Sequence, residues 1–161
     1  MENSKTLLEA KNELKTKLRE GKLVTCPCCN QKAKIYRRKI SSNVAYGLIV
    51  LSKKYYGEFH LEKTLIELDL LKIVRSDLPK LRYWGLISAL EGTREDVSSR
   101  NGYYTITEAG RMFVMNKISI PKYVYIYNNK PLNKSGSSDR VKITDCLGEK
   151  YDYTEMMSLT E

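Results

Sequence analysis

The spacing of apolar residues predicts two amphipathic helices in the middle of the chain. The first begins after the N-cap residues Ser41, Ser42 and Asn43, ends near Gly57, and places four apolar residues on one face: Val44, Leu48, Leu51 and Tyr55. The second follows at once, with an apolar face formed by Leu61, Leu65, Leu68 and Leu71. A third, short helix over residues 77–84 is predicted because Ser76 or Asp77 can cap it, Pro79 is tolerated in its first turn and Gly85 can end it.

A charged helix is predicted over residues 5–20. Its apolar stripe is thin, consisting of Leu7, Leu14 and Leu18, and its other faces mix acids and bases. Such a helix packs on its own domain or on a second copy of the chain, and a nucleic-acid-binding arm is the alternative. Gly21 ends it.

Alternating residues predict strands in the rest of the chain. Residues 86–90 and 103–106 flank a polar loop, 92–102, and Thr107 can cap the helix that follows. Residues 118–127 alternate up to the turn signal Asn128-Asn129, and a short strand and an acidic helical stretch come last. The predicted fold is α+β, with a core helical domain and a C-terminal β-hairpin extension. The segments are 1–24, 25–41, 42–115 and 116–161.

The net charge of +9, from 28 Lys and Arg against 19 Asp and Glu, is unevenly distributed. Residues 25–40 hold five bases and residues 116–134 hold four lysines, and neither stretch contains an acid. These two stretches account for the whole excess, because the remaining segments cancel. Such a charge suits a polyanionic partner or an acidic protein surface.

Composition and motifs exclude several classes of protein. No run of 18 apolar residues is present, and the first residues contain an acid and lack the apolar region of a secretory signal, so we expect neither a membrane span nor secretion. Four cysteines then indicate a reducing compartment, which we take to be the cytoplasm. Only one histidine is present, and no phosphate-binding glycine loop, H-E-x-x-H or G-x-S-x-G motif occurs, so we do not expect an enzyme. His60 is expected to cap or pack rather than act as a base.

Cys26-Pro27-Cys28-Cys29-Asn30 follows the C-P-x-C pattern of a zinc knuckle. Cys26 and Cys29 form the better pair of ligands, because adjacent cysteines could hardly bind one ion without strain. A structural Zn²⁺ needs four ligands. The remaining candidates are Cys28, His60, Cys146, a carboxylate, or the same turn of another subunit. The alternative is a reduced turn without metal, in which Cys28 and Cys146 are small buried hydrophobic residues.

Residues 31–40 alternate as a strand that is rich in bases. In such a strand Arg37 and Lys39 project to one side, and the other side carries Lys32, Lys34, Tyr36 and Arg38. Bases with an interleaved tyrosine suit phosphate contact and base stacking. The alternative is an edge strand that charge protects from aggregation.

A second alternating strand is rich in tyrosine. Tyr123, Tyr125 and Tyr127 would line one face, opposite Val124 and Ile126 on the core side. Tyrosines in this arrangement could stack on bases or form a protein interface, and half-burial in an ordinary sheet is the alternative.

The order of elements across residues 42–115 resembles a winged helix. Leu81-Arg82-Tyr83-Trp84-Gly85-Leu86-Ile87, followed by Gly102-Tyr103-Tyr104-Thr105-Ile106-Thr107-Glu108-Ala109-Gly110-Arg111, is similar to the pattern of MarR- and PadR-type proteins. The resemblance implies that helix 77–84 enters the major groove of DNA and that the hairpin is the wing. The contacts it implies are Lys80, Arg82, Tyr83, Arg94 and Arg100, with Trp84 in the core.

The segments CPCCNQKAKIYRRK, LPKLRYWGLI and IPKYV together resemble an uncharacterised family of bacteriophage proteins. Members often read C-P-C-C-G-Q, so Asn30 replaces a glycine at a turn, and Asn tolerates the same positive φ. This resemblance implies a phage origin and brings no established activity with it.

The leading hypothesis is a DNA-binding winged-helix regulator or accessory protein of a phage. The short helix and the wing carry no net positive charge, so the basic segments would supply most of the affinity. The alternative is a protein-interaction module that engages a host or phage protein through its tyrosine-rich and winged-helix surfaces. A homodimer through helix 5–20 would follow the habit of winged-helix proteins.

Overall fold

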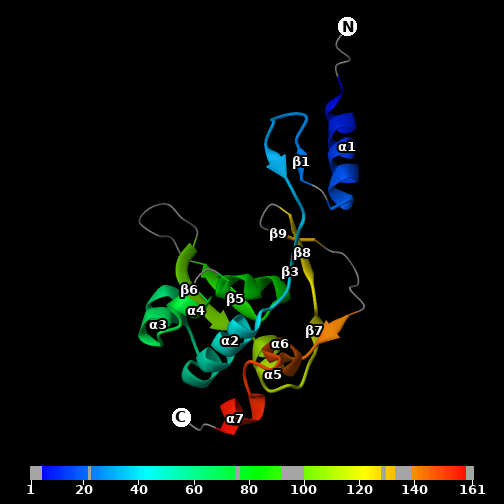
Figure 1. Ribbon diagram of the computed structural model, residues 1–161. Helices are drawn as coiled ribbons and strands as arrows, with labels where there is room; N and C mark the ends of the chain where they lie inside the picture. The colour runs from blue at the N-terminus through cyan, green and yellow to red at the C-terminus, as the bar shows by residue number, and fades with distance from the viewer. Residues whose placement is uncertain are drawn as a thin grey trace. The chain divides into compact units, whose positions relative to one another are not determined.

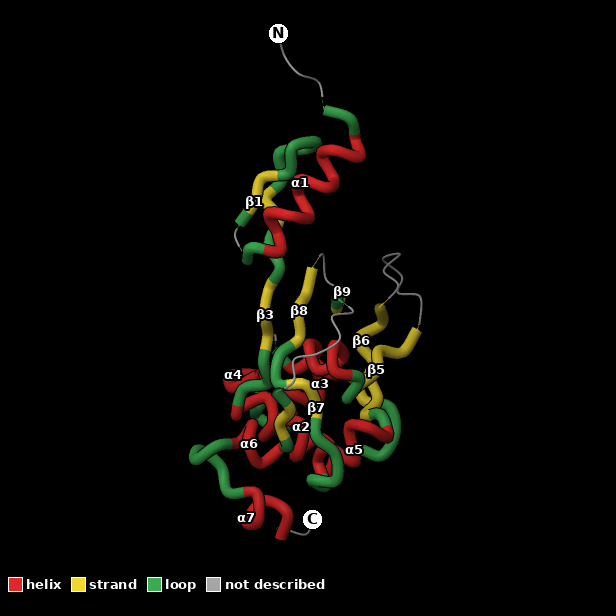
Figure 2. The backbone as a smooth tube through the Cα atoms, turned by 90° about the vertical axis from the view of Figure 1, so that its right-hand side faces the viewer, coloured by secondary structure: helices red, strands yellow, loops and turns green. Residues whose placement is uncertain are grey.

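The computed structural model (Figures 1 and 2) describes residues 5–21, 23–74, 77–91, 100–127, 130–132 and 139–158. The chain forms two compact units, each built from two stretches of sequence. Unit 1 comprises Met1–Arg38 and Val124–Ser135, and unit 2 comprises Lys39–Tyr123 and Gly136–Glu161. The fold is α+β with small sheets, as predicted. The expected C-terminal segment, 116–161, is divided between the two units.

Unit 1 is one helix beside short strands. Helix α1 (Leu7–Arg19) begins with a capping box, in which Thr6 Oγ1 accepts the Glu9 N–H and the Glu9 carboxylate accepts the Thr6 N–H. It lies alongside the hairpin of β1 (Val24–Thr25) and β2 (Lys32–Ala33) in Figures 1 and 2. A second sheet has the order β3-β8-β9, from β3 (Tyr36–Arg38), β8 (Val124–Tyr127) and β9 (Lys130–Pro131).

Unit 2 is mainly helical. Its central helix is α2 (Ser42–Lys54), capped by Ser41, and Ala45, Leu48, Ile49 and Leu51 are fully buried on it. The core also contains the predicted apolar residues Val44, Leu61 and Leu65. The other helices are α3 (Leu61–Glu67), α4 (Leu71–Val74), α5 (Glu108–Val114), α6 (Ile143–Leu147), α7 (Tyr153–Ser158) and the 3₁₀ helix η1 (Leu78–Trp84).

The sheets of unit 2 are small and antiparallel. The larger has the order β4-β6-β5, from β4 (Phe59–His60), β5 (Ile87–Glu91) and β6 (Arg100–Ile106). In the smaller sheet, β7 (Ile120–Pro121) pairs with β10 (Arg140–Val141). The predicted strands 86–90 and 103–106 correspond to the hairpin of β5 and β6.

The predicted second and third helices take different forms in the structure. Asp69 adopts a left-handed conformation, φ 54°, and the predicted second helix is therefore divided into α3 and α4. The third helix is a 3₁₀ helix, in which the Asp77 side chain makes no cap and instead forms an ion pair with Lys80 at 2.7 Å. Gly85 ends it with φ 74°, as predicted.

Two segments predicted as single strands are each divided. Residues 31–40 form β2 and β3, which belong to different sheets. Residues 118–127 form β7 in unit 2 and β8 in unit 1. Regular alternation predicts the faces of a strand, but it does not predict which partners its backbone groups find.

A close approach at Gly110 joins η1, β5 and α5. Thr107 Oγ1 accepts the Gly110 N–H at 3.0 Å, as its predicted capping role requires, and donates to Gly85 O at 2.6 Å. A Cβ atom on Gly110 would lie 2.1 Å from Leu86 O, which itself accepts the Thr107 N–H. Only glycine therefore fits at this position.

We expect Gly110→Ala to lower the free energy of unfolding of unit 2 by about 2–3 kcal/mol, because backbone atoms must move to admit the methyl group. The fluorescence of Trp84, the one tryptophan of the chain, reports urea unfolding of unit 2. The control is Gly57→Ala, since nothing lies within 4 Å of a Cβ there, and its effect should stay within about 0.5 kcal/mol. Equal effects of the two substitutions would contradict the packing described.

Candidate nucleic-acid interface

The positive charge of the chain is concentrated in unit 1. This unit has twelve Lys and Arg against four Asp and Glu, a net of +8, although it is the smaller of the two. Unit 2 has sixteen bases against fifteen acids, a net of +1. Most of the positive charge of the two acid-free stretches therefore belongs to one compact unit.

Strand pairing brings the two acid-free stretches together. In the antiparallel β3–β8 pair, Tyr36 lies opposite Ile126, Arg37 opposite Tyr125 and Arg38 opposite Val124. Residues directly opposite each other share a face of the sheet. Arg37 and Tyr125 therefore lie on one face, and Tyr36 and Arg38 on the other.

An exposed tyrosine with two cations marks the second of these faces. Tyr36 is 48% exposed. Lys34 Nζ lies 5.7 Å from its ring centroid and Arg38 Cζ lies 5.4 Å from it, both within cation–π range. The predicted grouping of Lys34, Tyr36 and Arg38 on one side is thus present. Lys32 in β2 and Lys39 at the start of unit 2 are also exposed.

The tyrosines of the predicted tyrosine-rich strand are half-buried. Tyr125 and Tyr127 belong to β8 in unit 1, and Tyr123 ends the first stretch of unit 2. Ile126 is buried, as its predicted core position requires. Tyr127 and Ile35 help to line an apolar groove.

This groove, of about 660 Å³, runs beside α1 within unit 1. Leu14, Leu18, Ile35 and Leu132 contribute to its apolar lining, and three cations of α1 also line it: Lys11, Lys15 and Arg19. Sequence reasoning missed this groove. Two signals for it were present in the sequence: the predicted apolar stripe Leu7, Leu14 and Leu18, which lines the groove, and the spacing of these cations at i, i+4 and i+8, which places them on one side of a helix.

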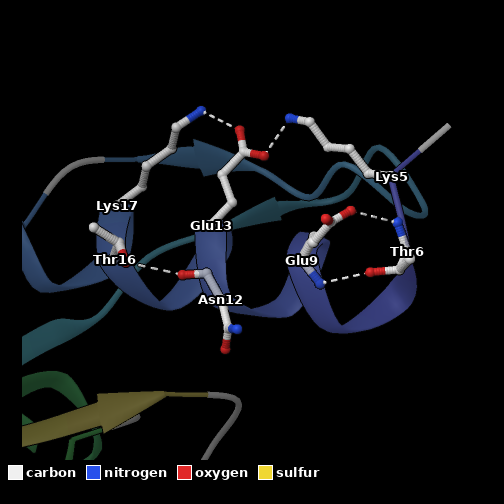
Figure 3. A network of polar contacts seen from close by, with 7 residues as sticks. All are labelled: Lys5, Thr6, Glu9, Asn12, Glu13, Thr16 and Lys17. Carbon is white, nitrogen blue, oxygen red and sulfur yellow. Dashed lines mark hydrogen bonds and ion pairs between the residues drawn. The ribbon is translucent and has the colours of Figure 1, made fainter. Parts of the chain in front are cut away.

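Polar contacts along α1, which forms one wall of the groove, stabilise this helix (Figure 3). Glu13 accepts hydrogen bonds from Lys5 and, at 2.9 Å, from Lys17, while Thr16 Oγ1 donates to Asn12 O at 2.9 Å. The bonds from Lys5 and Lys17 lower the pKa of the Glu13 carboxyl to about 2.

The cysteine turn joins β1 to β2. The Cys26 N–H donates to Gln31 O at 2.7 Å, the Asn30 N–H donates to Cys26 O at 3.0 Å, and Asn30 has the expected positive φ of 60°. The backbone N–H groups of Cys28 and Cys29 hydrogen-bond to the Cys26 sulfur and lower the pKa of its thiol. Cys28 and Cys29 are exposed, so the expectation of a buried Cys28 in a metal-free turn is wrong.

Cys146 lies in unit 2, away from the turn in sequence, and is half-buried against the core. Burial raises the pKa of its thiol to about 11. Among the residues that the structure describes, no three His, Cys, Asp or Glu side chains gather into a group that could hold a metal ion.

The residues that the winged-helix resemblance implicates are largely engaged within unit 2. Lys80 is paired with Asp77, and an Arg82 guanidinium nitrogen donates to Tyr83 Oη at 3.3 Å. Trp84 packs against the core and its Nε1–H donates to Pro121 O at 2.9 Å. Arg94 falls outside the described residues, as does the side chain of Arg100 in β6.

His60 serves as a cap. Its Nδ1 accepts the Lys63 N–H at 3.3 Å at the start of α3, and its ring meets Tyr103 edge to face, with centroids 5.1 Å apart. This is the structural role that its position predicts.

Comparisons with known proteins return no relatives. No family model matches the chain, and neither a curated protein nor a solved structure does. Among the helices that the structure describes, none has the length and apolar character that crossing a bilayer requires.

We expect the Glu13 carboxyl to titrate near pH 2, and Lys5→Gln or Lys17→Gln to raise its midpoint toward 4.5, because each removes a hydrogen bond to the charged form. Since the folded pKa is the lower one, the carboxylate stabilises unit 1 above about pH 4.5, and this contribution is lost as the pH falls through about 2. Carboxyl carbon shifts measured by NMR report the midpoint. Lys63→Gln in unit 2 is the control and should leave it unchanged.

Proposed function

We propose that this chain is a DNA-binding regulator or accessory protein of a phage, and that the β3–β8 sheet of unit 1 supplies most of its affinity for DNA. The observation that carries the proposal is the exposed Tyr36 ring with the cations of Lys34 and Arg38 beside it, on the unit that holds +8 of the net charge.

The chemistry of this surface suits a nucleic acid. An exposed aromatic ring stacks on a base regardless of its identity, and neighbouring Lys and Arg side chains neutralise the phosphates on either side. Stacking on Tyr36 requires an accessible base face, which single strands and unpaired ends offer. The comparison of single-stranded with duplex DNA is therefore part of the test.

Unit 2 would take the part of a winged helix. Three features support this: the order α2, α3, η1 and the β5–β6 hairpin, the pairing of β4 with β6, and the Gly85 and Thr107 caps on either side of the hairpin. Because unit 2 is nearly neutral and Lys80 is paired with Asp77, its contribution would be to orientation and selectivity.

We expect the double substitution Lys34→Gln/Arg38→Gln to weaken DNA binding at 100 mM salt and to reduce the slope of log K against log salt concentration by roughly 1.5–2, since two phosphate contacts are lost. Fluorescence anisotropy with labelled single-stranded and duplex oligonucleotides measures both quantities.

The matched control is Lys63→Gln/Lys72→Gln, which removes two exposed positive charges from unit 2 and should change the slope much less. Tyr36→Leu should weaken single-strand binding roughly 5- to 150-fold and leave the slope unchanged, because stacking carries no charge. If the two double variants behave alike, or if the wild-type chain binds neither oligonucleotide at 100 mM salt, the proposal is wrong.

The groove beside α1 favours a second candidate function, a protein-interaction module. Its apolar lining and the cations Lys11, Lys15 and Arg19 complement an amphipathic segment with acidic side chains. Half-buried Tyr127, from the tyrosine-rich strand, contributes to the same surface.

For this alternative we expect Lys11→Glu/Lys15→Glu to abolish capture of a protein partner from nuclease-treated host lysate, because the substitution reverses the charge along the groove. Lys34→Gln/Arg38→Gln should retain that partner. Mass spectrometry of the captured material is the measurement. If the wild-type chain captures the partner only from lysate that has not been treated with nuclease, then nucleic acid bridges the chain and the partner, and the alternative is excluded.

A further inference from the structure

The cysteine turn carries three sulfur atoms on a short hairpin, those of Cys26, Cys28 and Cys29. The Cys26 sulfur receives hydrogen bonds from the backbone N–H groups of Cys28 and Cys29, and the thiols of both residues also contact it. N–H groups directed at a sulfur compensate the negative charge of a thiolate, which is the form that binds metal. The same two N–H groups would donate to the Cys26 sulfur when it is bound to a metal ion, and such hydrogen bonds orient metal ligands.

Zinc in a structural site takes four ligands in a tetrahedron. The turn offers Cys26 and Cys29, and adjacent Cys28 can hardly join Cys29 on the same ion. In the described part of the chain, no third His, Cys, Asp or Glu completes a group with them. The turn of one chain therefore supplies two of the four ligands that a structural Zn²⁺ needs.

The other soft ligands of the chain are engaged in unit 2. His60 uses Nδ1 to cap α3 and packs its ring against Tyr103. The Cys146 thiol is half-buried against the core. A second copy of the turn, by contrast, supplies two thiolates of the right kind, and Cys29 is exposed at the hairpin end where a second copy can approach.

We propose that Cys26 and Cys29 from two copies of this chain bind one Zn²⁺, so that the metal joins the copies through their β1–β2 hairpins. The site would hold four thiolates and half a zinc ion per chain.

Electrostatics favour this arrangement. A zinc ion with four thiolates carries a net charge of −2, and it would lie between two units that each carry +8. Lys32 in β2 and Lys34 beyond it are exposed on the same stretch of chain and are attracted to that negative centre. The metal thus offsets part of the repulsion that two basic units would otherwise experience.

The test uses the full chain purified under reducing conditions in the presence of Zn²⁺. We expect elemental analysis to give half a zinc per chain, and light scattering to give twice the mass of one chain. A chelator should produce monomers, and added Zn²⁺ should restore the dimer. After exchange with Co²⁺, the thiolate-to-cobalt absorption should correspond to four thiolates per ion.

Cys29→Ser should lose both zinc and the dimer, whereas Cys28→Ser, in the same turn and also exposed, should retain both. Circular dichroism checks that each variant is folded. One zinc in a monomeric chain, a dimer that survives the chelator, or no zinc in the reduced wild-type chain would each overturn the proposal. These readouts do not involve DNA, so they decide the metal site independently of the proposed function.

Discussion

The antiparallel pairing of β3 with β8 is the constraint on which unit 1 depends. It joins two segments that lie far apart in the sequence and that both lack acidic residues. The pairing places Arg37 beside Tyr125, and it leaves Tyr36 exposed with Lys34 and Arg38 around its ring. Without this pairing, the two stretches of sequence that form unit 1 would not be joined by a sheet, and the basic residues of β3 would lie in an unpaired segment.

The two units differ in how they use polar side chains. In unit 2 several candidate contacts stabilise the unit itself: Lys80 pairs with Asp77, Trp84 donates to Pro121, and His60 caps α3. Arg111, the last residue of the pattern that resembles a winged helix, likewise donates to Tyr55 O at 2.9 Å. In unit 1 the basic residues outnumber the acidic residues by twelve to four, so ion pairs within the unit cannot neutralise its positive charge. An excess of this kind costs self-repulsion, which a polyanion or a bound anionic centre relieves.

Local signals in the sequence predicted the structure where local physics decides it. The caps at Ser41 and Thr107, the left-handed Gly85 and the positive φ of Asn30 follow from the preferences of single residues. Period-two alternation likewise predicted that Lys34, Tyr36 and Arg38 share a side. The division of the two long strands and the groove beside α1 depend on partners distant in sequence, which alternation does not specify.

Because unit 1 is built from two separate stretches of the chain, it cannot be completed until its second stretch has been synthesised. Its N-terminal stretch ends at Arg38, and the strand that pairs with β3 begins at Val124, after most of unit 2. At about 5–20 residues per second, a ribosome needs roughly 4–17 s to make the intervening chain. During that interval the basic segment has no sheet to join. A product that terminates before Val124 therefore carries +6 of the +8 of unit 1 and lacks the β3–β8 surface, because that surface requires the chain to extend through β8.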